Sequence, residues 1–234
     1  MRDKDLIERR FAKALSRYHT MAVVQRSIAE RLAELIPSDL EARNAYEIGA
    51  GSGFLTYKLL ERYPNVQLIA NDITDKSEIF LPSDVTFIKG DGEAVPLPAK
   101  IDLIASASTV QWFDDLPEFI IKSYNALNDC GIIAVSTFGK KNFRELGEQL
   151  DYYSKEELEN VFKSVGFEVL ICEDWQEQMD FETPMEVLQH IKATGVNALH
   201  KAKWTRCELE KFIANYPQPA TLTFHPIIIV AKKC

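Results

Sequence analysis

The stretch NAYEIGAGSGFLTYKLL, residues 44–60, decides the fold of this chain. A short apolar run leads into three glycines at alternate positions, and an apolar pattern with helical spacing follows. A strand, a glycine turn and a helix in this order bring the backbone close to a cofactor, because glycine adopts conformations that other residues avoid. Several different cofactors bind such turns, so the surrounding residues must indicate which one.

Strands and helices alternate after this turn. A helix is predicted at 115–130, with Gly131 just past its end, and a second one begins with a capping box formed by Ser154 and Glu157. Apolar strands that alternate with helices indicate a doubly wound, mostly parallel α/β sheet. Seven strands are predicted, at 45–49, 66–73, 85–96, 100–108, 131–139, 167–179 and 220–234.

Two helical segments lie outside this alternation. Apolar residues at helical spacing from Lys4 to Leu35 predict one or two helices, with a break near 16–20. Residues 182–216 are amphipathic and too long for an ordinary connection, which favours a helical lid. We expect a single domain, 1–234, with an N-terminal helical cap at 1–40, an α/β core at 41–181 and 217–234, and the lid at 182–216.

Composition restricts the partners of the chain. It has 27 basic and 35 acidic side chains and a net charge of -8, so nucleic acid and anionic membranes are unfavourable partners. No apolar run approaches the ~18 residues of a membrane span, and the first residues are charged. The 4 cysteines are widely spaced, which favours reduced, mostly buried thiols over a zinc site. We therefore expect a cytoplasmic, monomeric protein without a metal.

The turn itself disfavours a dinucleotide. Gly49, Gly51 and Gly53 form the pattern G-x-G-x-G, and Phe54 stands where the dinucleotide fingerprint needs its last small residue. Glu47 places a carboxylate beside the turn. A carboxylate suits a cationic ligand better than a diphosphate.

Residues after the next strands indicate the parts of this ligand, because doubly wound sheets bind ligands outside the carboxyl ends of their strands. Asp72 follows Gly53 at close to the spacing of about 20 residues at which an acid binds ribose hydroxyls. Asp91 is placed to accept a hydrogen bond from an exocyclic amine, and Trp112 to lie beside a sulfonium. Taken singly, Asp72 would also suit a helix N-cap and Asp91 a turn.

Ribose, adenine and a positive charge without phosphate together describe S-adenosylmethionine. With these residues, the sequence resembles the class I methyltransferases over nearly its whole length. The resemblance implies a Rossmann-like fold and a cofactor site shared by the N-terminal cap and the strand ends. We expect this site to contain Tyr18, Gln25, Glu47, Gly49, Ala50, Gly51, Gly53, Asp72, Ile73, Asp91, Gly92, Glu93, Ala94, Ser106, Gln111 and Trp112.

Three further stretches resemble one subfamily, the malonyl-[acyl-carrier protein] O-methyltransferases of biotin synthesis. RRFAKALSRYHTMAVVQRSIAERL, residues 9–32, is similar to the arginine-phenylalanine, tyrosine and glutamine pattern of that family, and STVQWFDDLP, residues 108–117, to its serine-rich stretch ending in Gln-Trp. STFGKKNFRELGEQL, residues 136–150, matches its Thr-Phe-Gly and Phe/Leu-Arg-Glu-Leu run. The third stretch is the most specific, because it follows the fifth predicted strand, next to the expected position of the transferable methyl.

The resemblance implies that the methyl acceptor is a malonyl carboxylate. Arg144 is the predicted partner of that carboxylate, because a guanidinium binds it bidentately and lysine does not. An ionised carboxylate needs no general base, so Tyr18 and Arg144 are the predicted catalytic residues, acting by closure and orientation. Without the resemblance, Arg144 would instead pair with Glu148 on a helix surface, and Tyr18 would be a core aromatic.

The predicted reaction transfers a methyl group from S-adenosylmethionine to malonyl-[acyl-carrier protein] or malonyl-coenzyme A. It leaves S-adenosylhomocysteine, and the malonyl methyl ester primes pimeloyl synthesis for biotin. Two alternatives remain open: another small acid or quinone-like acceptor, and a non-catalytic scaffold that binds S-adenosylmethionine. An acidic carrier protein would bind a local basic surface, for which the candidates are Lys140, Lys141, Arg144, Lys192, Lys201, Lys203 and Arg206.

Overall fold

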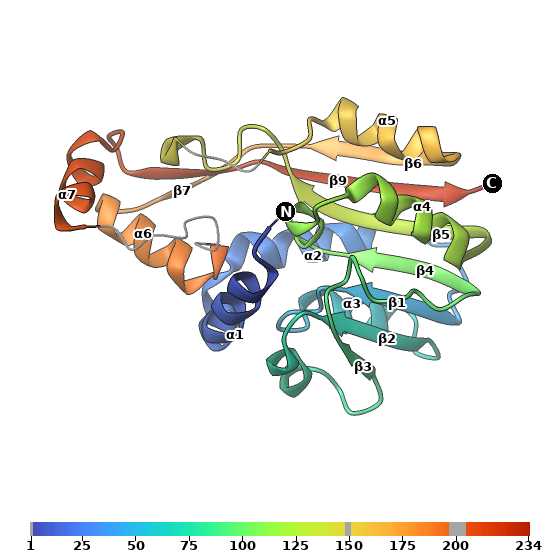
Figure 1. Cartoon of the computed structure of the whole chain (residues 1–234). Helices are drawn as coiled ribbons and strands as arrows, with labels where there is room; N and C mark the ends of the chain where they lie inside the picture. The colour runs from blue at the N-terminus through green and yellow to red at the C-terminus, as the bar shows by residue number, and fades with distance from the viewer. Residues whose placement is uncertain (1, 148–150, 197–204) are drawn as a thin grey trace.

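A computed structural model describes residues 2–147, 151–196 and 205–234 of the chain. Its centre is a seven-stranded sheet (Figure 1). The strands are β1 (Asn44–Ile48), β2 (Gln67–Asp72), β3 (Thr86–Lys89), β4 (Ile101–Ser106), β5 (Leu127–Phe138), β6 (Phe167–Asp174) and β9 (Pro226–Lys233). They lie in the order β3-β2-β1-β4-β5-β9-β6, and only β9 runs antiparallel to its neighbours. The predicted doubly wound, mostly parallel sheet of seven strands is confirmed.

Helices cover both faces of this sheet. On one face lie α2 (Val23–Leu35) and α3 (Phe54–Arg62), and on the other α4 (Leu116–Ala126) and α5 (Lys155–Val165) (Figure 1). Successive strand residues point to opposite faces, so Ile132 joins the core under α2 and α3, whereas Ile133 packs with Phe119 and Phe162. Both faces are apolar and buried, as the continuous apolar runs of the sequence predicted.

The strand order reverses at β1, which pairs with β2 on one side and β4 on the other. The N-terminal helix α1 (Lys4–Met21) lies beside the carboxyl ends of these strands (Figure 1). Ala22 separates α1 from α2, shortly after the predicted break at 16–20. Helix α1 therefore covers the place where this sheet topology binds ligands.

The last two predicted strands each leave the main sheet part-way. After β6 the chain forms β7 (Glu177–Asp180), and β8 (Thr221–Phe224) precedes β9; β7 and β8 pair as a separate two-stranded sheet. His225 occupies the change of direction between β8 and β9, where its Nε2 lies 3.0 Å from an Asp174 carboxylate oxygen. The predicted helical range 182–216 contains α6 (Pro184–Ala193) and α7 (Arg206–Asn215).

Two local expectations were wrong. Gly131 does not end a helix but lies within β5, because α4 already stops at Ala126 and buried Leu127 begins the strand. The cysteines are free but mostly not buried: Cys130, Cys207 and Cys234 are exposed, since each lies at a chain end, a strand bend or an exposed helix. The capping box of Ser154 and Glu157 was predicted correctly.

Truncating a side chain between the sheet and α5 should test this packing. Phe162→Ala is expected to lower the free energy of unfolding by about 3–5 kcal/mol, because Phe162 is fully buried and its loss leaves a cavity. Chemical denaturation measures the change. The control Ile79→Ala, at a side chain that is 79% exposed, should change it by less than about 0.5 kcal/mol. Equal effects of the two variants would contradict the assigned core.

Candidate active site

The first two glycines of the turn between β1 and α3 have left-handed backbone conformations, and the surroundings of each show why glycine is needed there. Gly49 has φ 73° and Gly51 φ 55°. A Cβ on Gly49 would lie 2.0 Å from the Thr109 hydroxyl oxygen, so this position packs against the chain after β4. A Cβ on Gly51 would meet only a carbonyl oxygen, at 3.9 Å, and would otherwise point into open space. That open space belongs to a cavity under α1 that we call the main cavity.

The main cavity lies where α1 faces the carboxyl ends of β1, β2 and β4, the place at which this sheet topology binds ligands. Its charged lining residues are Asp72, Asp91 and a single cation, Lys4, among the described part of the chain. This charge pattern is unfavourable for a diphosphate and suits a ligand with hydroxyls and a positive charge. Of the predicted site residues, the cavity brings together Tyr18, Gly49, Gly51, Asp72, Ile73, Asp91, Gly92 and Trp112.

Two buried carboxylates hold the turn and face the ligand space. Asp72 accepts hydrogen bonds from the N–H groups of Gly51 (2.8 Å) and Thr74 (3.0 Å), and burial raises its pKa. Glu47 accepts one from the Thr56 hydroxyl at 2.6 Å, and burial raises its pKa to about 7. Burying a carboxylate without a cation is costly. A positively charged ligand beside Glu47 would offset that cost.

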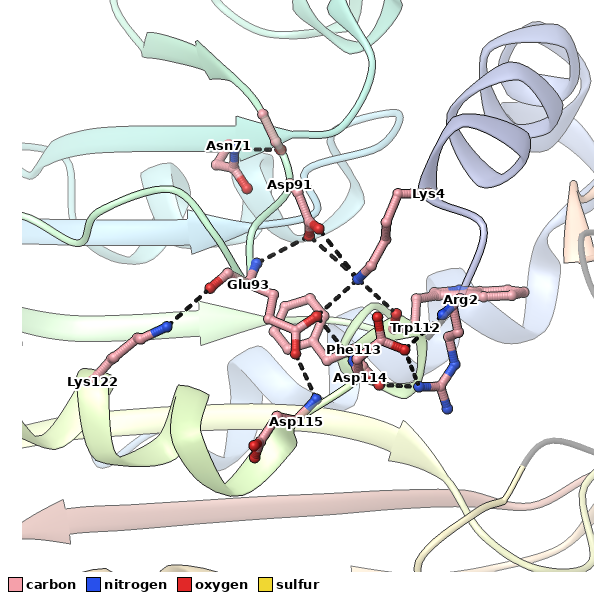
Figure 2. A network of polar contacts seen from close by, with 11 residues as sticks. Arg2, Lys4, Asn71, Asp91, Glu93, Trp112, Phe113, Asp114, Asp115 and Lys122 are labelled. Carbon is pink, nitrogen blue, oxygen red and sulfur yellow. Dashed lines mark hydrogen bonds and ion pairs between the residues drawn. The ribbon is translucent and has the colours of Figure 1, made fainter.

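The amino end of α1 is fixed to the strand ends by the ion pairs that Figure 2 shows. The Lys4 ammonium donates to Glu93 at 2.8 Å and to the Trp112 carbonyl at 3.0 Å, and lies 3.3 Å from the Asp91 carboxylate. Glu93 also accepts the N–H groups of Asp114 and Asp115, and its pKa is lowered. Helix α1 is thereby held across the cavity, with Tyr18 on its inner side.

Two smaller cavities adjoin the main one. The first brings Gln25, Glu47 and Ala50 to the turn beside Tyr18. The second is narrow, and we call it the inner cavity; it is lined by Tyr18, Gln25, Ser108, Gln111, Trp112, Phe138, Asn142, Phe143 and Tyr152, among others. Tyr18 lines all three cavities. Burial, followed by the charge of Asp72, raises its pKa, so its hydroxyl stays protonated.

Five predicted site residues do not line these three cavities. Gly53 caps α3, and Ser106 is buried with its hydroxyl donating to the Ile48 carbonyl at 2.9 Å. Glu93 and Ala94 lie at an outer groove beside α1. The fifth, Arg144, is half-exposed and lies 3.3 Å from the Glu145 carboxylate.

Several site residues were not predicted. Lys4, Asn71, Ser108 and Tyr152 line the cavities, and Asn71 Oδ1 is buried without a hydrogen-bond partner among the described residues. Asn71 directly precedes Asp72, so its position at a strand end was a usable signal. Nothing in the local sequence places Tyr152 at the site, because the residues that share its cavity, such as Tyr18 and Gln25, are far away in the sequence.

Comparison with known proteins bears on this site. A family model described as methyltransferase domain matches residues 46–135. A malonyl-[acyl-carrier protein] O-methyltransferase of Bacteroides thetaiotaomicron is 37% identical, over 99% of this chain and 98% of that protein. The enzyme of the same name from Acinetobacter baylyi is 34% identical, over 99% of this chain and 97% of that protein.

This chain belongs to the malonyl-[acyl-carrier protein] O-methyltransferase family. An S-adenosylmethionine-dependent methyltransferase from Mesorhizobium loti has the same fold, with a TM-score of 0.55 and 14% identity over 87% of this chain and 96% of that one. The predicted class I methyltransferase fold and the predicted subfamily are thus confirmed. None of the helices in the described ranges has the length and apolarity to cross a membrane, and those residues contain no cluster of metal-ligand side chains.

The substitution Glu47→Gln should reduce the dependence of the free energy of unfolding on pH. The pKa of Glu47 is about 7 in the folded protein, against 4.5 ordinarily. Between these values the folded chain binds more protons than the unfolded chain, so the free energy of unfolding falls as pH rises through this window. Denaturation at several pH values should show a smaller fall for Glu47→Gln than for the wild type and the control Glu168→Gln. Identical falls would show that Glu47 does not titrate there.

Proposed function

We propose that this protein transfers a methyl group from S-adenosylmethionine to the free carboxylate of malonyl-[acyl-carrier protein]. The products are the malonyl methyl ester, which primes pimeloyl synthesis for biotin, and S-adenosylhomocysteine. The observation that carries the proposal is the identity of 37% along 99% of the chain to an enzyme of this name. The main cavity supports it, because its acidic lining suits a cationic cofactor without phosphates.

The lining residues fit the parts of S-adenosylmethionine. Asp72 would accept from the ribose hydroxyls, and Asp91 with Gly92 would bind the adenine. Glu47, Tyr18 and Gln25 surround the far end of the turn, where the methionyl part would bind. Gly53, Ala94 and Ser106 would contribute through the backbone they support, and Glu93 through its bond to Lys4, which holds α1 over the site.

The proposed reaction needs no acid or base catalysis from the side chains. S-adenosylmethionine supplies a methyl group on a positively charged sulfur, and the acceptor carboxylate is ionised at neutral pH. No proton has to be removed, so the protein must align the carboxylate oxygen with the methyl and exclude water. Tyr18 and Trp112 form an apolar wall at the junction of the cavities. The positive charge on the sulfur and the negative charge on the carboxylate both disappear as the methyl moves. An apolar wall that excludes water therefore does not oppose the reaction.

Arg144 is proposed to orient the malonyl carboxylate. Its guanidinium now faces Glu145, so the acceptor would replace or share that partner. The carrier protein is proposed to bind nearby on a basic surface that includes Lys141 and Lys192. Lys140 and Arg206 already pair with Glu157 and Glu210, and Lys201 and Lys203 lie outside the described residues. The free thiols are consistent with a reducing compartment, which supports a cytoplasmic site of action.

Methyl ester formation from labelled S-adenosylmethionine and malonyl-[acyl-carrier protein] tests the reaction and the role of Arg144. Arg144→Ala should lower kcat/KM about 10- to 100-fold, because a charged hydrogen bond is worth about 1.5–3 kcal/mol. The control Arg43→Ala, at an exposed side chain just before the amino end of β1, should leave it unchanged. No ester with the wild type would overturn the proposed acceptor, and undiminished activity of Arg144→Ala would overturn the role of Arg144.

Cofactor charge should be visible as proton release. A positive charge beside Glu47 lowers its pKa from about 7, so binding S-adenosylmethionine near neutral pH should release protons. S-adenosylhomocysteine lacks the charge and should release fewer. Calorimetry in buffers of different ionisation enthalpy measures the difference, and Glu47→Gln should abolish it. Equal proton release by the two ligands would contradict the placement of the sulfonium beside Glu47.

A further inference from the structure

The inner cavity opens, on the side away from the cofactor turn, into a surface groove. Gln111, Phe138 and Tyr152 line both spaces. At the opposite end, Tyr18, Gln25 and Ser108 are shared with the cavity at the turn. The inner cavity therefore lies between the cavity at the turn and the groove, and a ligand that extends from the groove through it would have its tip at Tyr18.

The inner cavity contains buried polar atoms that no described residue satisfies. Gln25 Oε1, Ser108 Oγ and Gln111 Oε1 have no hydrogen-bond partner within the described ranges. Ser108 reaches this position with a left-handed backbone, φ 53°, which is unfavourable for serine. A buried polar atom left unpaired costs about 1–3 kcal/mol, so these atoms indicate a polar ligand.

Tyr152 places a hydrogen-bond donor where the inner cavity meets the groove. Asn142 Oδ1 accepts the His225 N–H at 3.2 Å, which leaves Asn142 Nδ2 to donate to the Tyr152 hydroxyl at 3.1 Å. The Tyr152 hydroxyl oxygen thus accepts a hydrogen bond from Asn142, and its proton remains available to another acceptor. Burial raises the pKa of Tyr152 to about 12, so the group is neutral and protonated at physiological pH.

The groove itself is polar and has only one more carboxylate than cations. Its lining includes the cations Arg2 and Lys140 and the carboxylates Asp114, Asp151 and Glu157, and Arg2 lies 3.5 Å from Asp114. Lys140 and Glu157 pair at 2.6 Å, so part of this charge is already neutralised. A groove of this kind suits a long, neutral chain with amide groups better than a strongly charged one.

We propose that the groove and the inner cavity together form the acyl-thioester site, with the pantetheine arm in the groove and the Tyr152 hydroxyl donating to the thioester carbonyl. This rests on the proposed function, since the malonyl carboxylate must then lie at the Tyr18 end, beside the cofactor. The carbonyl, one methylene further out, falls at the Tyr152 end. Pantetheine is common to carrier protein and coenzyme A, so this site alone accepts either.

Tyr152→Phe tests the assignment. The variant should lose one neutral hydrogen bond and lower kcat/KM for malonyl-[acyl-carrier protein] and malonyl-coenzyme A about 5- to 10-fold, mainly through KM. Its affinity for S-adenosylhomocysteine should be unchanged. Tyr124→Phe, whose hydroxyl contacts the Cys234 carbonyl far from the groove, is the matched control and should behave as wild type.

Two comparisons separate the possible results. Equal losses for both thioesters support a site for the shared arm, whereas a loss with only the carrier protein would overturn it in favour of a protein contact. Unchanged kinetics with both thioesters would also overturn it. If the wild type forms no ester, the proposed function fails, and calorimetry of malonyl-coenzyme A binding to wild type and Tyr152→Phe still decides the thioester site: a weaker variant supports it and equal affinity refutes it.

Discussion

The buried carboxylate of Asp72 is the constraint on which the cofactor site depends. It ends β2 and accepts the N–H of Gly51 from the turn after β1, so two strand ends are joined at the point where the strand order reverses. No described cation pairs with it, and its cost of burial is offset chiefly by backbone N–H groups, including those of Gly51 and Thr74. The turn is therefore shaped before any ligand arrives, with Gly51 facing open space.

The α/β core and much of the lining of the main cavity were predictable, because both follow from short-range patterns. Strand periodicity placed Asp72 and Asp91 at adjacent strand ends, and the glycine spacing identified the turn. Lys4 and Tyr152 were not predictable, because Lys4 pairs with Glu93 and Tyr152 lines a cavity with Tyr18 and Gln25, all far away in the sequence. The division of the last two predicted strands into β6 and β7 and into β8 and β9 was missed as well. An apolar run in the sequence does not show where the strand that pairs with it changes.

The predicted position of Arg144 illustrates the same limit. The local pattern put it near the acceptor, but the structure holds its segment through tertiary contacts: Phe143 N–H donates to the Thr223 carbonyl, and the Glu145 carboxylate accepts from the Thr223 N–H at 3.0 Å. Glu145 therefore fixes both the segment and the guanidinium beside it. A sequence pattern can identify such a motif, but only the fold shows which of its members face a cavity and which hold it in place.

The walls of the two binding regions come from different parts of the chain. The main cavity is built from α1 and the first four strand ends, whereas the outer wall of the inner cavity comes from Phe138, Asn142, Phe143 and Tyr152. The segment that forms this outer wall is held by hydrogen bonds to His225 and Thr223, beside and within the small sheet, rather than by the glycine turn. Substitutions in one wall can accumulate without disturbing the other. An ancestor with this architecture could exchange one methyl acceptor for another while keeping its cofactor, which is how one fold comes to serve many substrates.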